Sequence, residues 1–299
     1  FITLKGQIMQ GDMTAKDIDK KNDPKMGGIP PLIDLHLHAG WTDFDHADQE
    51  KRTEDEIKVR MARFLYAYRE AGIIAARDAG GYEADLISGD ITKVIINAGM
   101  FDQKNVNNAA FRDKVSASTA VWAKIFITGG VGTKKEETIV PRFKKDDFKA
   151  LVRWLHGQGK KVMVHCYGGE SLDWCIEEKV ETVEHGVFMT RKQAAGMAEN
   201  GVAYVPTAAI YRLLSDEPEL FGIPESIREN ACHAAEAHMN AVRYAREEGV
   251  LIGHGTDFYS DMAFIGHAYD ELNTLMDMGL SFNEAVAAGT VNALKILGG

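Results

Sequence analysis

Short apolar runs alternate with longer amphipathic stretches along most of the chain. Apolar residues recur with helical spacing in the stretches between the runs, and the runs themselves are short and rich in β-formers. Strands alternating with helices are typical of a parallel sheet with crossover helices, and eight of them predict an α/β fold of the (β/α)8 TIM barrel type. The predicted strands are 32–38, 72–78, 93–98, 121–128, 161–167, 182–186, 203–207 and 251–257.

Helix boundaries are marked by capping residues. A Ser or Thr followed three residues later by Glu or Gln can satisfy the first free N–H groups of a helix. Glycine after the last helical turn tolerates the left-handed conformation that ends many helices, and Gly72 and Gly201 occupy such positions. The three predicted capping boxes are Thr53 with Glu56, Thr190 with Gln193, and Ser281 with Glu284.

The amino-terminal residues do not share this alternation. Residues 1–30 are polar, charged and closed by glycines, so we expect a short irregular N-terminal arm or the remnant of an accessory layer. Residues 31–299 are predicted to form one barrel domain. Because the chain ends soon after the last predicted helix, we expect little or no accessory β-sandwich. Whether the native protein is longer than this chain is left open.

The composition and net charge of the chain indicate which kinds of binding partner to expect. The 299 residues are 45% hydrophobic and carry a formal net charge of -10, which disfavours nucleic acid and acidic membranes as partners. No apolar run approaches the roughly 18 residues of a membrane span. Cys166, Cys175 and Cys232 lack metal-binding spacing and are expected as free thiols. We expect a small-molecule substrate and, by default, a cytoplasmic location. Whether the chain forms homo-oligomers, and whether a leader sequence was removed, is left open.

Polar residues stand late in the predicted apolar strands. In a TIM barrel the carboxyl ends of the strands form the active site. His36 and His38 share one face of the first strand, because side chains two apart point the same way. An inward pair could bind one cation at about 2.0 to 2.1 Å per nitrogen. The other residues in such positions are Lys124, His165, His185 and Asp257.

Lys124 stands out because an ammonium group is costly to bury among apolar neighbours and cannot bind a metal. Two solutions are open. The ammonium could pair with Asp257, or a desolvated amine with a lowered pKa could react with carbon dioxide. The resulting carbamate presents two oxygens in carboxylate geometry and could bridge two cations.

Together these motifs resemble those of the amidohydrolase superfamily in its binuclear form with a carbamylated lysine. The set comprises "HLH", "AKIFITGG", "VHCYG", "VEHG" and "GTD". The phrases "RDAGG", "VAYVPT" and "MGLSFNEAVAAGTVNALKILG" look most like prolidase-like and imidazolonepropionase-like members. The latter branch typically lacks the lysine, so Lys124 favours the prolidase-like branch.

The resemblance implies a role for each residue. His36, His38 and Asp257 would bind the more buried metal, His165 and His185 the more exposed one, and the Lys124 carbamate would bridge them. A bridging hydroxide would attack a carbonyl polarised by the exposed metal, and Asp257 would pass its proton to the leaving nitrogen. Two divalent ions are therefore expected. Zinc suits the ligands, and manganese, cobalt or iron stay open.

The resemblance implies that residues 31–299 form a metal-dependent hydrolase barrel. The predicted activity is hydrolysis of the amide bond of a dipeptide, X-Pro or related, or of an acylated amino acid. The same centre would also serve a lactonase, a phosphotriesterase or a cyclic amide hydrolase. A non-catalytic metal-binding or assembly barrel is the alternative of another class. A fold alone does not choose among these chemistries.

Further residues are secondary candidates. We predict substrate contacts for Tyr167, Thr128 and His267. Glycines after Thr128 would let backbone approach the metals or ligand, or simply form a turn. Arg77 and Asp78, at the end of the second strand, suggest an internal salt bridge. Histidines placed outside the site are His254, predicted to face the helices, and His233 and His238, predicted to be structural.

Overall fold

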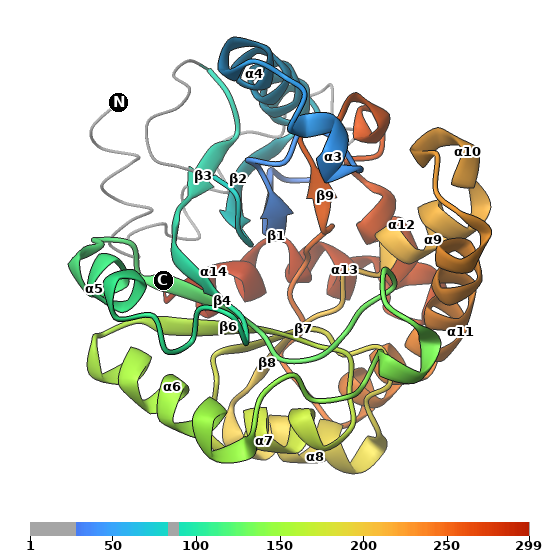
Figure 1. The fold of residues 1–299 in the computed structure, drawn as a ribbon. Helices are drawn as coiled ribbons and strands as arrows, with labels where there is room; N and C mark the ends of the chain where they lie inside the picture. Colours follow the sequence, from blue (N-terminus) through green and yellow to red (C-terminus); the bar gives the residue numbers. More distant parts are fainter. Residues whose placement is uncertain (1–27, 83–89, 299) are drawn as a thin grey trace.

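A computed structural model of the chain describes residues 28–82 and 90–298. Parallel strands surround the centre of the molecule and helices cover them on the outside (Figure 1). The predicted (β/α)8 barrel is thereby confirmed. Almost all of the predicted arm, residues 1–30, lies outside the described residues, apart from 28–30.

The strands follow the predicted runs closely at the start of the barrel and less closely at its third and eighth positions. They are β1 (Leu32–His38), β2 (Ile73–Asp78), β3 (Lys93–Ile95), β4 (Asn97–Phe101), β5 (Trp122–Phe126), β6 (Lys161–Cys166), β7 (Thr182–His185), β8 (Ala203–Val205) and β9 (Phe258–Tyr259). Hydrogen bonding orders them as β3-β2-β1-β9 and β4-β5-β6-β7-β8.

Helices connect these strands and form the outer layer (Figure 1). They are α3 (His46–Gln49), α4 (Glu54–Glu70), α5 (Ala109–Ala117), α6 (Lys145–Gly157), α7 (Glu170–Glu177), α8 (Arg191–Asn200), α9 (Ala208–Asp216), α10 (Pro218–Phe221), α11 (Glu225–Glu247), α12 (Asp270–Asp277), α13 (Phe282–Ala288) and α14 (Val291–Leu297), with 3-10 turns η2 (Lys135–Glu137) and η3 (Met262–Phe264). No helix within the described ranges has both the length and the apolarity to cross a membrane.

The predicted capping signals are all present. The side chains of Thr53, Thr190 and Ser281 each accept a hydrogen bond from the backbone N–H of the third residue of their helix. The side chain of that third residue in turn accepts from the backbone N–H of the capping residue. Gly72 and Gly201 have φ angles of 98° and 71°, as expected at left-handed helix ends. Local sequence therefore sets where these helices begin and end.

The prediction of one strand over 93–98 is wrong, because two short strands meet at Ile96. The Asn97 side chain accepts from the backbone N–H of Gly99 at 2.9 Å, which takes that donor out of the regular ladder. The β4–β5 pairing accordingly shifts register between Asn97 and Met100. Since β3 and β4 are consecutive, the chain itself joins the two sheets here.

The prediction of a regular strand over 251–257 is also wrong, although this segment does close the barrel. Its backbone bonds to Tyr204 of β8 on one side, and His254 O accepts from Leu35 N of β1 on the other. A Cβ on Gly253 would lie 2.5 Å from Leu35 Cδ1, so glycine lets the segment fit between the strands. Asp34 binds both the N–H and the hydroxyl of Thr256, which replaces ladder bonds.

Two apolar clusters hold the fold together. The smaller one draws Leu35, Trp122, Met163 and Val205 from strands on different sides of the barrel, so it fills the interior. The larger cluster packs the strands against the surrounding helices. Burial on this scale stabilises the barrel that carries the polar residues described next.

Candidate metal centre

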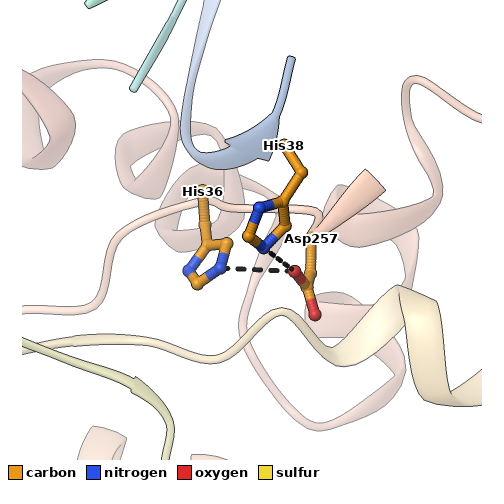
Figure 2. Close-up of side chains that lie close together, drawn as sticks. All are labelled: His36, His38 and Asp257. Atoms are coloured by element: carbon orange, nitrogen blue, oxygen red, sulfur yellow. Dashed lines mark ion pairs between the residues drawn. The ribbon is translucent and has the colours of Figure 1, made fainter. Parts of the chain in front are cut away.

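His36, His38 and Asp257 form the tightest part of the site. Asp257 Oδ1 lies 3.3 Å from His36 Nε2 and 3.1 Å from His38 Nε2 (Figure 2). One ligand atom from each residue falls within 4.8 Å of the other two, a spacing suited to one metal ion. The two histidines come from the end of β1, and Asp257 from the closing segment beside it.

The remaining predicted ligands lie next to this group. The ring centroids of His165 and His185 are 4.5 Å apart, and His185 is 4.9 Å from His36 by the same measure. Lys124 Nζ lies 3.3 Å from His36 Nε2. The structure thus brings all six predicted side chains together, while their roles as ligands stay a prediction.

Three residues that form or support the site have left-handed backbone conformations. The φ angle is 72° at His185, 55° at Thr207 and 60° at Asp257. Non-glycine residues rarely adopt such angles, and they concentrate at functional sites where the surrounding structure holds them. Here each occurs where a strand of the barrel ends, so the turn re-aims the side chain.

Each histidine at the site has one ring nitrogen engaged by the protein. His38 Nδ1 lies 3.0 Å from Gly80 O, and His165 Nε2 lies 2.7 Å from Gly129 O. A carbonyl oxygen only accepts, so these ring nitrogens carry protons. His185 Nδ1 lies 2.7 Å from the hydroxyl of Thr207, which itself donates to Pro206 O. Such second bonds are usual for metal-binding histidines.

The opposite ring nitrogens therefore present lone pairs. Burial lowers the pKa of His38 to about 4 and that of His165 to about 3, so both rings are neutral at pH 7. His38 Nε2 then faces a carboxylate oxygen of Asp257 with no proton between them. The pKa of Asp257 lies well below its usual value although burial raises it, so the carboxylate is ionised. Converging electron pairs of this kind fit a divalent cation.

Lys124 is fully buried among these groups. Burial lowers the pKa of its amine to about 8, against the opposing attraction of Glu184 and Asp257. Of the two solutions predicted for this residue, the ion pair with Asp257 is not observed in the described chain. A lowered pKa is what carbamylation requires, because only the neutral amine attacks carbon dioxide.

The internal salt bridge predicted for Arg77 or Asp78 is present, but its partner is Glu184. Arg77 Nη2 lies 2.8 Å from Glu184 Oε1, and both side chains are fully buried. Asp78 instead accepts from the backbone N–H of Ala39 and Gly80. Glu184 also contacts His36, and together with Thr207 it is a site residue that the sequence reasoning missed.

The candidate substrate residues differ in their positions. Tyr167 is next to His165, with ring centroids 5.1 Å apart, and its hydroxyl accepts from Val131 N. The Thr128 hydroxyl bonds to Gly129 O and accepts from Tyr167 N, while His267 pairs with Asp270 at 2.7 Å. Substrate contact by these three residues stays a prediction.

Gly130, two residues after Thr128, lies close to two residues of the site. A Cβ on Gly130 would lie 3.2 Å from the His165 ring and 3.5 Å from the Tyr167 hydroxyl. On the other flank, Trp41 stacks on His38 at 3.8 Å between ring centroids. The centre is therefore bordered by aromatic rings on both sides.

The histidines predicted to lie outside the site do so. His254 is fully buried and lies beside Gly289, at the end of α13. A Cβ added to Gly289 would lie 3.5 Å from His254 Cβ. His238 bonds to the Tyr204 hydroxyl at 2.8 Å, and His233 packs against Phe188. These contacts agree with structural roles.

Known proteins resemble this chain over most of its length. The model of the Amidohydrolase family matches residues 29–299. An uncharacterised protein of Mycobacterium tuberculosis (strain ATCC 25618 / H37Rv) is 26% identical over 317 residues, covering 97% of this chain and 80% of the relative. Ochratoxinase of Aspergillus niger is 26% identical over 172 residues, covering 57% of this chain and 35% of its own.

Solved structures share the fold. A Xaa-Pro dipeptidase with bound methionine aligns with a TM-score of 0.74 at 23% identity, over 90% of this chain and 75% of its own. The A. niger ochratoxinase structure aligns with a TM-score of 0.75 at 20% identity, over 90% of this chain and 72% of its own. At these identities the likeness shows the barrel fold.

Proposed function

Because the chain belongs to the amidohydrolase family, we propose that it is a metal-dependent hydrolase that cleaves the amide bond of a dipeptide or an acylated amino acid. Hydrolysis of amide bonds follows from the family. Metal dependence and the substrate class are the proposal. The observation that carries it is the convergence of His36, His38 and Asp257 within 4.8 Å, beside two further histidines and Lys124.

The proposed metal ligands divide into two sets. Nε2 of His36 and of His38, with Asp257 Oδ1, would hold the first ion. His165 and His185 would contribute to the second through the ring nitrogens that Gly129 and Thr207 leave free. Lys124, as its carbamate, would complete both sets. Bound divalent ions would supply Lewis-acid activation of water and of the scissile carbonyl.

Asp257 is the proposed proton carrier. Its side chain is 21% exposed, whereas the side chains of His36 and His38 are almost fully buried, so it is the ligand that a substrate could reach. Its carboxylate is ionised at neutral pH and can accept a proton from attacking water. The Asp257 carboxyl group can then deliver that proton to the leaving nitrogen as the amide bond breaks.

Two observations support the proposed substrate class: the names of the structural neighbours and the side chains that border the site. The structural neighbours include a Xaa-Pro dipeptidase and a prolidase complexed with N-methylphosphonate-L-proline, both under 25% identical. The Tyr167 hydroxyl, beside His165, is a donor that could bind a substrate carboxylate. A dipeptide or N-acyl amino acid would place its carboxylate there and its amide carbonyl toward the metals.

A substrate panel tests this proposal. X-Pro and other dipeptides and N-acyl amino acids should be hydrolysed by the metal-loaded chain, and not by the metal-free chain or by Asp257→Asn. Lactones and phosphotriesters form the comparison arm. Turnover confined to that arm would reject the amide substrate class, and no turnover with fully loaded protein would favour a non-catalytic barrel.

A further inference from the structure

A buried carboxylate contacts the metal centre from behind. Glu184 Oε2 lies 2.6 Å from His36 Nδ1, the ring nitrogen that points away from Asp257. Glu184 Oε1 accepts from Arg77 Nη2 at 2.8 Å and from the Thr182 hydroxyl. The two oxygens are thus divided, one for Arg77 and Thr182 and the other for His36.

Arg77 is itself fixed from several strands. Its Nε donates to Leu35 O of β1 at 2.6 Å, and its Nη1 donates to Thr182 Oγ1 of β7 at 3.2 Å. The guanidinium carbon lies 4.3 Å from the ring centroid of Trp122 on β5. Glu184 therefore has a rigid support that spans the barrel interior.

Stability alone does not account for this pair. Two charges buried in a barrel interior lose their hydration, and a well-packed apolar pair of similar volume is often as stable or more stable. The Arg77–Glu184 pair could equally have been shielded from the site. Instead, one carboxylate oxygen is directed at His36.

A neutral His36 ring can carry its single proton on either nitrogen. With the proton on Nδ1, bonded to Glu184, the Nε2 lone pair faces Asp257 Oδ1 at 3.3 Å and is open to a metal. With the proton on Nε2, His36 would donate to Asp257 directly. That arrangement would block the ligand atom, and it would leave the Nδ1 lone pair facing Glu184 Oε2 at 2.6 Å.

We propose that Glu184, held in place by Arg77, is a positioning residue that keeps the His36 proton on Nδ1 and so presents Nε2 to the metal. This inference rests on the proposed metal centre. Carboxylates bonded to the second nitrogen of a metal-binding histidine typically contribute 10- to 100-fold to metal affinity or activity. Glu184 and Arg77 touch neither substrate nor metal in this account.

The test is the zinc affinity of Glu184→Gln, measured by chelator competition, together with the visible spectrum of the cobalt-loaded protein. We expect affinity to fall about 10- to 100-fold and the cobalt spectrum to change. Glu184→Asp, which keeps a carboxylate, should recover part of the loss. Glu271→Gln is the matched control, because Glu271 is also fully buried but bonds to Ala209 N, away from the centre.

The outcomes separate this inference from the proposed function. A parent chain that binds no zinc contradicts the metal centre itself. A parent that binds zinc while Glu184→Gln keeps its affinity within about twofold, with the same cobalt spectrum, overturns the role of Glu184 alone. If Glu184→Gln does not fold, nitrogen-15 NMR of the metal-free parent decides. A proton on Nδ1 of His36 alone supports the proposal, and a proton on Nε2, with or without one on Nδ1, overturns it.

Discussion

The two halves of the candidate centre differ in how complete they are. His36, His38 and Asp257 bring three ligand atoms within 4.8 Å using ordinary side chains. The other half has His165 and His185, and its third member, Lys124, cannot bind metal as an amine. The first half is thus ready for a cation, whereas the second requires a chemical change at Lys124. The comparison predicts that the first site can bind its ion without the second.

The largest effect is expected in the first half, at Asp257. Asp257→Asn keeps the shape but removes the charge and the proton acceptor. We expect the rate of amide hydrolysis to fall at least about 10³-fold, since one residue both binds metal and moves the proton. Steady-state kinetics with the best substrate of the panel measure this. A loss of less than tenfold would show that Asp257 does neither.

Lys124→Ala tests whether the second half depends on a modified lysine. Without a carbamate, the ion at His165 and His185 should be lost while the ion at His36 and His38 is retained, and activity should drop about 10²-fold. Metal analysis of the dialysed variant gives the stoichiometry, and intact mass of the parent at neutral pH reports the added carbon dioxide. Two ions retained in the variant would refute the bridge.

Thr207→Val tests the support of His185 within the second half. Valine keeps the volume but removes the oxygen that accepts from His185 Nδ1. We expect about a tenfold weaker second metal and an unchanged first one, because only the orientation of His185 is relaxed. Stepwise chelation of the zinc-loaded protein can resolve the two affinities. Equal weakening of both would indicate that the halves are not independent.

The smallest effect on activity is expected from Glu271→Gln, outside both halves. Burial raises the pKa of Glu271 to about 8 from 4.5, so the folded chain favours its protonated form. The associated stability is fully present below about pH 4.5 and is lost as pH rises towards 8. Relative to the parent, the variant should gain about 3 to 4 kcal/mol in unfolding free energy between pH 5 and pH 8, as measured by chemical unfolding. A constant difference across that range would contradict the shifted pKa.

Much of this architecture could be predicted from the sequence. His36 and His38 lie two residues apart on one strand, so they share a face wherever that strand is placed. The strand ends that carry Lys124, His165 and His185 meet because a barrel brings its carboxyl ends together. Family membership, now shown for residues 29–299, agrees with the resemblance drawn from the same motifs.

What the sequence did not predict has a physical cause. Alternation places Glu184 and His185 on opposite faces, yet both contribute to the site, because His185 has a φ of 72° and leaves the strand geometry. A charged residue inside the apolar stretch "TVEHG" was the available signal. The irregular closing segment depends on Asp34 bonding to Thr256, a contact across 222 residues that no local pattern encodes.

Whether amide hydrolysis depends on metal is tested by the metal content of the purified chain, paired with its rate of hydrolysis before and after chelation. We predict two divalent ions per chain, loss of hydrolysis on chelation, and recovery only when metal and bicarbonate are both returned. Full hydrolytic activity in the metal-free chain would show that the reaction does not need a metal.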